Sequence, residues 1–249
     1  MIDLKNKNAL VTGGSAGLGA SISKQLAAEG VNLAINYSSS KERAEALAAD
    51  LRDQYKVKVV VIQADVFGGA AIVDKLVEDA HSQLGGLDIV ISNAGWTKYI
   101  TYDRLDELDD EVWDKCFQAN IKTHFYLFRA AKKIFDANPE SGTFIVTSSL
   151  AGRIVYGSSM PYAVSKAGLI HLVRFLAQAL SVRVHAVCPG ILLTEWGKLF
   201  PPERNERAIE RSPIKKLADV DETAAEFVFL CKLSTSTGTT VGIDGGLLA

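Results

Sequence analysis

Short apolar runs rich in branched residues alternate along this chain with longer segments that carry the spacing of an amphipathic helix. The apolar runs are residues 8–12, 31–36, 57–63, 87–92, 142–148, 182–187 and 239–244. The helical segments are residues 17–29, 41–55, 70–84, 111–137, 162–180 and 222–231. Most runs are apolar at consecutive positions, which is typical of strands buried on both faces of a parallel sheet. The alternation therefore predicts an α/β fold with a doubly wound parallel sheet.

The length of 249 residues suits one large domain, and 48% hydrophobic with 22% charged residues allows a sizeable core. No linker or low-complexity tract divides the chain, so we expect a single domain over residues 1–249. The segment 189–219 breaks the alternation and holds four of the six prolines. We expect residues 191–219 to form a substrate loop or lid. A structural pair of surface helices is the alternative.

Charge and cysteine content exclude several classes of partner. A net charge of −2 and an isoelectric point of about 6.1 argue against nucleic acid or an anionic membrane, which need clustered Lys and Arg. The three cysteines match no metal-binding spacing, which favours a reducing compartment and no bound metal. The first residues lack the features of a signal peptide, and no apolar run approaches the ~20 residues of a membrane helix. We therefore expect a cytoplasmic protein.

A glycine-rich stretch, TGGSAGLG, follows the first apolar run and opens the first helical segment, from Thr12 to Gly19. Glycine lets the backbone approach a ligand closely, and the start of a helix presents free N–H groups and a positive dipole end. These features predict a site for a pyrophosphate. The TGxxxGxG spacing differs from the usual GxGxxG pattern, and a plain tight turn is the alternative.

The stretch YAVSK places Tyr162 and Lys166 one helical turn apart, directly after Pro161 at a helix start. Both side chains then point the same way. A phenol with a pKa near ~10 needs a neighbouring cation to transfer protons near neutral pH. The spacing therefore allows an acid–base pair, although a surface pair on an ordinary helix has the same spacing.

Further short motifs stand at or just after the ends of the predicted strands. They are ADV at 64–66, NAG at 93–95, SSLAG at 148–152, PG at 189–190 and IDGG at 243–246. Tyr162 follows Ser149 by thirteen residues, and Asn120 lies in the helix before the fifth run. In this combination and order the motifs resemble the short-chain dehydrogenase/reductase family, and the resemblance covers essentially the whole chain. The motifs fall at the sheet edge where ligands bind in such folds.

The resemblance implies a single-domain Rossmann-type sheet of about seven strands, a nicotinamide cofactor, and hydride transfer to or from a carbonyl or alcohol carbon. It implies that Tyr162 is the general acid in reduction and that Lys166 supplies the cation and holds the nicotinamide ribose. Ser149 is expected to hydrogen-bond the substrate oxygen, with Ser148 as the competing candidate. Asn120 is expected to hold a water in a proton relay toward Lys166; a local hydrogen bond within its helix is the alternative.

The resemblance also implies a set of cofactor-binding residues. The pyrophosphate loop would comprise Gly13, Ser15, Gly17, Leu18 and Gly19. The residues expected at the adenosine half are Asp65, Val66, Asn93, Ala94 and Gly95. The residues expected near the nicotinamide are Pro189, Gly190, Ile191 and Thr194, with Tyr162 and Lys166. The chain departs from the family pattern at Ser92 and His185, where Asn is commoner, and in a shortened turn before residue 182.

The end of the second predicted strand bears on the choice between NADP(H) and NAD(H). No Asp or Glu that would bind the ribose 2′-hydroxyl occurs there before Glu42. The chain instead offers polar side chains and a cation at a helix start, which suits a 2′-phosphate. These residues are Tyr37, Ser38, Ser39, Ser40 and Lys41. A serine-rich helix cap is the alternative, and Ala16 is neutral where many NADP enzymes carry Arg or Lys; we favour NADP(H) over NAD(H).

The residues that flank the catalytic positions are mostly apolar and aromatic, and they are our candidates for the substrate pocket. They are Trp96, Tyr99, Arg153, Val155, Tyr156, Met160, Leu192, Trp196, Leu199 and Phe200. The set favours a moderately hydrophobic 3-oxoacyl, polyketide-like or aromatic ketone reduced with NADPH; Arg153 would meet an anionic group or face water. The alternatives are an NAD-dependent alcohol or polyol dehydrogenase and a noncatalytic dinucleotide-binding protein. The family resemblance implies a homotetramer or homodimer.

Overall fold

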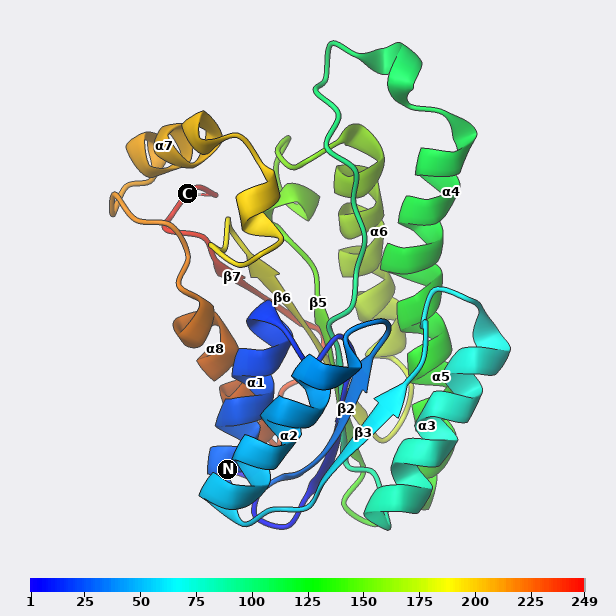
Figure 1. The fold of residues 1–249 in the computed structure, drawn as a ribbon. Coiled ribbons are helices and arrows are strands. Elements are labelled where there is room, and N and C mark those ends of the chain that lie inside the picture. The colour runs from blue at the N-terminus through cyan, green and yellow to red at the C-terminus, as the bar shows by residue number, and fades with distance from the viewer. Residues whose placement is uncertain (249) are drawn as a thin grey trace.

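Seven parallel strands form one sheet at the centre of the molecule (Figure 1). The computed structural model describes residues 1–248, apart from the side chain of Leu199. The strands lie in the order β3-β2-β1-β4-β5-β6-β7. They are β1 (Asn8–Val11), β2 (Asn32–Tyr37), β3 (Val59–Gln63), β4 (Ile89–Ser92), β5 (Gly142–Thr147), β6 (Val182–Pro189) and β7 (Thr239–Ile243). The order reverses between β1 and β4, so the predicted doubly wound sheet is confirmed, and a crevice for ligands is expected at that reversal.

Helices cover both faces of the sheet (Figure 1). One face carries α1 (Gly17–Ala28), α2 (Lys41–Tyr55) and α8 (Val220–Lys232). The other face carries α3 (Ala70–Leu84), α5 (Thr123–Ala137) and α6 (Met160–Leu176). Two further helices are α4 (Asp110–Phe117), which leads into α5, and α7 (Pro202–Arg211), which lies beyond the carboxyl ends of the strands. This layering explains why the strands are apolar at consecutive positions, since both of their faces are covered.

The predicted continuous helix over residues 111–137 is wrong in one respect, because a π-helical turn at Gln118–Lys122 separates α4 from α5. The wider turn contains Asn120, whose side chain bonds to groups outside its own helix. Thr123 also donates its hydroxyl to the carbonyl of Gln118 at 2.9 Å. Such turns occur often at functional sites, and a periodicity argument does not detect the insertion of one residue.

The predicted helix over residues 162–180 also differs from the structure, since α6 begins at Met160 and ends at Leu176. The turn that follows is short, and Ser181 adopts a left-handed conformation with φ of 68°. The segment 191–219 contains a 3₁₀ turn at Gly197–Leu199 and α7, and a bridge between Leu192 and Ala218 brings its two ends together. The segment is therefore an excursion between β6 and α8 whose two ends lie side by side.

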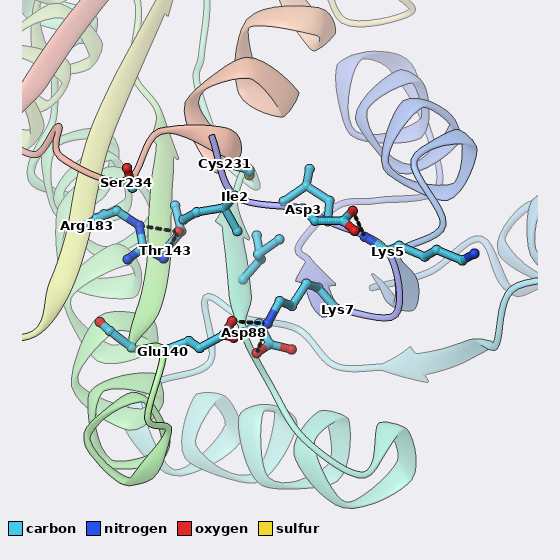
Figure 2. Close-up of a pocket in the computed structure, with 13 residues that line it drawn as sticks. Ile2, Asp3, Lys5, Lys7, Asp88, Glu140, Thr143, Arg183, Cys231 and Ser234 are labelled. Carbon is cyan, nitrogen blue, oxygen red and sulfur yellow. Dashed lines mark hydrogen bonds and ion pairs between the residues drawn. The ribbon is translucent and has the colours of Figure 1, made fainter.

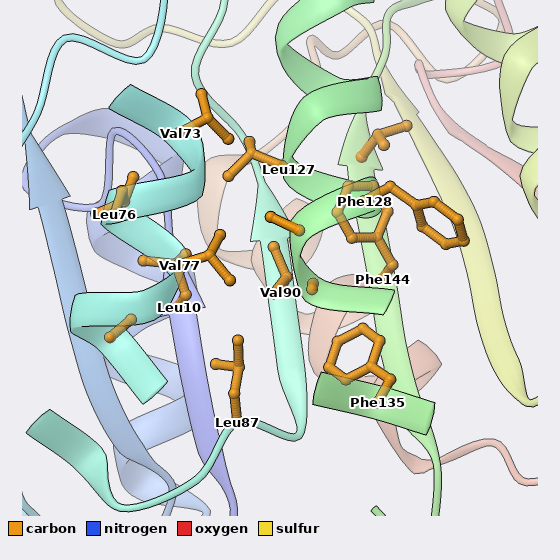
Figure 3. Close-up of a cluster of buried hydrophobic side chains, with 14 of the residues drawn as sticks. Leu10, Val73, Leu76, Val77, Leu87, Val90, Leu127, Phe128, Phe135 and Phe144 are labelled. Atoms are coloured by element: carbon orange, nitrogen blue, oxygen red, sulfur yellow. The ribbon is translucent and has the colours of Figure 1, made fainter. Parts of the chain in front are cut away.

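The face under α3 and α5 contains the aromatic part of the core (Figure 3). Phe128 on α5 meets Phe144 on β5 edge-to-face, with ring centroids 5.3 Å apart. Phe135 packs in the same cluster and is fully buried, as is Val90 on the neighbouring strand β4. Burial of these side chains stabilises β4 and β5 side by side, which places the carboxyl ends of the two strands next to each other.

Candidate active site

A cavity of about 460 Å³ opens at the carboxyl ends of the strands and collects most of the motifs found in the sequence. The glycine loop, the end of β4, the end of β5, α6 and the segment after β6 all contribute to its wall. The predicted site residues that line it are Gly13, Gly17, Leu18, Asn93, Ala94, Gly95, Ser149, Tyr156, Tyr162, Lys166, Pro189, Gly190, Ile191, Thr194 and Trp196. Residues distant in sequence therefore meet in one place, as the sheet topology requires.

The glycine loop turns from β1 into α1 with too little space for ordinary side chains. Gly13 and Gly17 have φ of 60° and 49°, in the left-handed region that favours glycine. A Cβ at Gly19 would lie 2.2 Å from the carbonyl oxygen of Gly13. Ala16 at the N-cap makes no side-chain hydrogen bond to the first turn of α1, which leaves N–H groups for an anion. The loop therefore fits the pyrophosphate of a dinucleotide.

Hydrogen bonds between polar side chains join β1, β4 and β5 behind this loop. The Thr12 hydroxyl oxygen accepts from the backbone N–H groups of Asn93 and Ala94 at 2.9 and 3.1 Å. The Asn93 side chain donates to the Thr12 carbonyl at 3.1 Å and accepts from the Thr147 hydroxyl at 3.0 Å. Asn93 thus connects three strand ends and fixes the wall that the sequence assigns to the adenosine half.

The phenol of Tyr162 lies beside Ser149 in the cavity. Burial raises the pKa of Tyr162 to about 12, while a hydrogen bond with Ser149 and the positive charge of Arg204 oppose the rise. Ser149 also caps the short helical turn that follows β5, by accepting from the N–H of Ala151 at 3.1 Å. With this pKa, Tyr162 is protonated at neutral pH and can donate to an oxygen placed between it and Ser149.

The side chain of Lys166 is almost fully buried under Tyr162, with 2% of its surface exposed. Its ammonium lies 5.7 Å from the centre of the Tyr162 ring and donates to the carbonyl of Thr147 at 2.8 Å. Burial lowers the pKa of Lys166 to about 8. Ser148 donates to the carbonyl of Lys166 at 3.0 Å, so its hydroxyl holds α6 against β5. Ser149, in contrast, shares a hydrogen bond with the phenol of Tyr162.

Asn120 points from the π-helical turn toward the same region. Its amide oxygen accepts from the N–H of Trp96 at 3.0 Å, and its amide nitrogen donates to the carbonyl of Trp96 at 2.9 Å and to Ser165 at 3.0 Å. A Cβ on Gly95 would lie 3.1 Å from the Asn120 oxygen and 3.4 Å from the Lys166 ammonium. Asn120 therefore lies near Lys166. Its side-chain hydrogen bonds go to residues outside its own helix, so the local hydrogen bond considered as the alternative is not formed.

Some predicted cofactor residues lie around the cavity without lining it. Asp65 accepts from the N–H of Phe67 at 3.1 Å, and the carbonyl of Val66 accepts from the Thr123 hydroxyl at 3.1 Å. Ser15 in the glycine loop and Gly19 in the first turn of α1 are both buried. The polar group at the end of β2 is more distant; its buried member is Tyr37, and its remaining members lie at the start of α2: Ser38, Ser39, Ser40 and Lys41.

The structure does not bring all predicted substrate residues to the cavity. Arg153 is exposed and does not line it, and Val155 points into solvent with 91% of its surface exposed. Trp96 is held through its backbone by Asn120, and Lys115 lies 4.7 Å over its ring. Neither Tyr99 nor Met160 lines the cavity, whereas Leu192 and Phe200 do. The predicted contribution of the Leu199 side chain lies outside the described residues.

Sequence reasoning missed Asn36 and Arg204. Asn36, buried on β2, accepts from the N–H of Gly13 at 3.3 Å and donates to the carbonyl of Ala64 at 3.0 Å, which supports the glycine loop. An amide inside an apolar strand was the available signal. Arg204 lines the cavity from α7. No local pattern indicates its role, because its position depends on how the segment 191–219 folds back.

Another cavity, of about 560 Å³, lies at the opposite edge of the sheet, near the chain start (Figure 2). Its charged groups already interact with each other. Lys7 pairs with Glu140 and lies 4.0 Å from Asp88, and Arg183 donates to the Thr143 hydroxyl at 3.0 Å. Ligands of doubly wound sheets bind at the carboxyl ends of the strands, so the cavity around Tyr162 is the candidate site.

Within residues 1–248, no group of three or more His, Cys, Asp or Glu side chains is arranged to hold a metal ion. None of the described helices is both long and apolar enough to cross a membrane.

Comparison with known proteins identifies the family. A family model described as enoyl-(acyl carrier protein) reductase matches residues 13–248. The 3-oxoacyl-[acyl-carrier-protein] reductase FabG of Staphylococcus epidermidis is 32% identical, over 97% of this chain and 99% of that protein.

Solved structures agree with this result. A short-chain dehydrogenase of Burkholderia cenocepacia J2315, in complex with NADP, is 31% identical, covers 100% of both chains and superposes with a TM-score of 0.90. The NADPH-dependent 3-quinuclidinone reductase of Rhodotorula rubra is 30% identical, covers 98% of this chain and 92% of its own, and has a TM-score of 0.89. With its glycine loop and Tyr162 gathered at one sheet edge, this chain belongs to the short-chain dehydrogenase/reductase family and is an NAD(P)-dependent oxidoreductase.

Proposed function

We propose that the protein reduces a ketone to a secondary alcohol with NADPH and that Tyr162 is the proton donor. The observation that supports this most directly is the meeting of Ser149, Tyr162 and Lys166 in one cavity beside the glycine loop. A noncatalytic protein on this fold would not need a phenol, a hydroxyl and a buried ammonium gathered in one cavity. The chain acts in this proposal as a single domain, with residues 191–219 as the lid over the substrate.

Each of the residues in the cavity has a separate role in the proposed reduction. When bound, the nicotinamide supplies the hydride that the carbonyl carbon receives. Ser149 donates a hydrogen bond to the carbonyl oxygen and so orients it, and Tyr162 transfers its phenolic proton to that oxygen. The ammonium of Lys166 stabilises the phenolate that forms, because opposite charges in a buried site attract strongly. We propose that Asn120 positions a water near Lys166, through which Tyr162 regains its proton.

Tyr162→Phe tests this assignment. The variant keeps the ring and its packing but lacks the proton donor, so turnover of ketones should fall by at least ~100-fold. Binding of NADPH should stay within about twofold, and steady-state kinetics with a fluorescence titration measures both. An unchanged rate would refute the role of Tyr162 as the acid.

Preference for NADPH is supported by the start of α2. Ser40 occupies the N-cap but accepts no hydrogen bond from the backbone N–H groups of the helix, so the serine-rich cap considered as the alternative is not formed. Arg43 donates to the Ser40 hydroxyl at 3.3 Å and also pairs with Glu195 at 2.9 Å, so part of its charge is balanced. A 2′-phosphate would therefore meet hydroxyls and the positive charge of Lys41. The related Burkholderia structure contains NADP, and the Rhodotorula reductase is NADPH-dependent.

A titration with NADPH and NADH tests the cofactor preference. NADPH should bind at least ~10-fold more tightly, a difference of about 1.4 kcal/mol. Lys41→Ala and Ser39→Ala should weaken NADPH and leave NADH nearly unchanged, because only NADPH carries the phosphate. Equal weakening of both cofactors would contradict this site, and tighter binding of NADH would favour an NAD-dependent dehydrogenase instead.

The substrate we propose is a moderately hydrophobic carbonyl compound, such as a 3-oxoacyl, polyketide-like or aromatic ketone. The cavity near Tyr162 is lined by Tyr156, Trp196 and Phe200, which suit an apolar or aromatic body. The Staphylococcus relative is a 3-oxoacyl reductase by name. A screen that follows NADPH oxidation by such ketones and, in parallel, NAD⁺ reduction by simple polyols separates this proposal from a polyol dehydrogenase.

We further propose that the chain forms a homotetramer or homodimer in a reducing, cytoplasmic compartment. Large apolar side chains are exposed on α5 and α6, among them Phe125 and Phe175. All three cysteines are free and buried, as a reducing location allows. Light scattering of the purified protein measures the assembly, and Phe175→Glu should shift it toward the monomer.

A further inference from the structure

Arg204 brings a positive charge into the active-site cavity from the first turn of α7. Its charge is close enough to Tyr162 to oppose the rise in the pKa of that phenol. The chemistry described above does not use Arg204, because Ser149, Tyr162 and Lys166 already account for proton transfer. A charge at this place needs another explanation.

Aromatic rings from three segments surround the guanidinium of Arg204. Its central carbon lies 4.6 Å from the ring centre of Phe200, 5.1 Å from that of Tyr156 and 6.0 Å from that of Tyr99. Cation–π contacts of this kind stabilise the charge and hold its position. They do not replace hydrogen-bond acceptors, so the N–H donors of the guanidinium are still available to an anion.

One donor of Arg204 is indeed unsatisfied. Its Nη1 atom is buried and has no hydrogen-bond partner among the residues that the structure describes. Arg204 also forms none of the ion pairs found within residues 1–248, although carboxylates are frequent along α7. Buried donors in native proteins are rarely left without a partner. The missing partner is therefore expected to come from a bound molecule.

We propose that the substrate carries a carboxylate, which binds the guanidinium of Arg204 while the ketone lies between Ser149 and Tyr162. A planar carboxylate matches the fork of guanidinium donors, and Tyr156 and Phe200, the two neighbouring rings that line the cavity, fit an apolar or aromatic body between the two ends. This inference rests on the proposed ketone reduction and names the class of substrate for that site. It also replaces Arg153, the exposed residue that the sequence offered for an anionic group, with Arg204.

A pair of ketones of matched shape tests the proposal. 4-Acetylbenzoate carries a carboxylate, and 4-acetylbenzamide is its neutral counterpart. The wild type should reduce the benzoate with the higher kcat/KM. Arg204→Gln should lower kcat/KM for the benzoate by about 30-fold and change the benzamide by no more than about twofold, because a charge-assisted hydrogen bond is lost only with the anion. Arg204→Lys, which keeps the charge but not the fork, should recover part of the loss.

The control is Arg207→Gln, on the same helix and with the same change of charge. Arg207 does not line the active-site cavity, so this variant should treat both ketones as the wild type does. Circular dichroism and an unchanged affinity for NADPH check that each variant is folded. A weaker affinity for NADPH in Arg204→Gln would assign the guanidinium to the cofactor and overturn the proposal.

The remaining outcomes separate this inference from the proposed reduction. An equal loss for both ketones would mean that Arg204 acts through packing or through Tyr162, and a wild-type preference for the benzamide would refute carboxylate recognition. If neither ketone is reduced, the proposed reaction fails for these compounds. Calorimetry on the NADPH-loaded protein then measures whether Arg204 binds the carboxylate. Binding of 4-acetylbenzoate that Arg204→Gln abolishes supports the proposal; equal or absent binding of both compounds overturns it.

Discussion

Burial has opposite effects on the two titrating side chains of the site. It raises the pKa of Tyr162 to about 12 and lowers the pKa of Lys166 to about 8, because both charged forms lose contact with water. A protonated phenol suits the acid needed for reduction. Because its pKa is lower than in water, Lys166 can release and accept a proton near neutral pH. Near neutral pH only Lys166 reaches its state at a cost in folding free energy, because the Tyr162 phenol is uncharged in both the folded and the unfolded chain.

Lys166→Met should stabilise the cofactor-free protein against unfolding. The same variant should lose its activity. With a pKa of about 8 when folded and 10.5 as the ordinary value, the charged lysine costs about 3 kcal/mol at pH 7. The variant also loses the hydrogen bond to Thr147, which offsets part of the stability gained by removing the charge. We therefore expect a net gain of about 1–2 kcal/mol in the free energy of unfolding. Activity should fall by at least ~100-fold. Urea unfolding at pH 7 and steady-state kinetics measure the two effects.

The same lysine predicts a pH dependence of known sign. Between pH 8 and 10.5 the unfolded chain binds more protons at Lys166 than the folded chain does, so the wild type gains stability as the pH rises. Lys166→Met lacks this gain, so its advantage should shrink from pH 8 upward, disappear between about pH 9 and pH 10, where the remaining cost of the charge equals the lost hydrogen bond, and be reversed by pH 10.5. An advantage that stays constant over this range would show that desolvation of the charge is not its source.

At the scale of elements, the π-helical turn at Gln118–Lys122 links the long α4–α5 segment to the site. It turns Asn120 out of the helix and toward the backbone of Trp96, which follows β4. The same side chain bonds to Ser165 on α6, the helix that carries Tyr162 and Lys166. One residue thus connects three elements whose relative placement would set the geometry of the proposed proton transfer.

Asn120→Ala should cost about 2–3 kcal/mol of stability, because it leaves buried N–H and carbonyl groups of Trp96 without partners. It should also lower kcat by at least ~10-fold through the displaced relay. Gln118→Ala, in the same turn, is the matched control and should change stability by less than about 0.5 kcal/mol. Thermal unfolding and single-turnover kinetics test both variants. Full activity in Asn120→Ala would assign the residue a structural role alone.

Over the whole molecule, the side chains that stabilise the fold and those that line the active-site cavity lie at different places along the strands. Two hydrophobic clusters lie on its faces, paired charges close the edge at the strand starts (Figure 2), and the reactive groups stand at the carboxyl ends. The core under α5 contains Phe144, whose strand β5 leads directly into Ser148 and Ser149. Packing in the core therefore fixes the position of the site without contacting a substrate.

Phe144→Ala should lower the free energy of unfolding by about 3–5 kcal/mol, since it leaves a cavity against Phe128 and Phe135. The folded fraction at low temperature should keep a kcat near that of the wild type, because no group that contacts the substrate is removed. Val155→Ala is the control, and its exposed side chain predicts a change below about 0.5 kcal/mol. Urea unfolding with activity measured at 10 °C distinguishes loss of fold from loss of chemistry; a cost below about 1 kcal/mol would contradict this view of the core.

The sequence alone determined the parallel sheet, the alternation of strands and helices along the chain, the glycine loop and the Tyr162–Lys166 pair. These features depend on local periodicity, on spacing within one helical turn and on the backbone freedom of glycine. All three are properties of residues that are close together in the sequence. Only the tertiary structure decided that α4 and α5 are separated by a π turn, that Val155 faces solvent and that Arg204 reaches the cavity. Those outcomes depend on packing between residues far apart in the chain, and a side chain's direction there follows from the contacts that the whole fold makes.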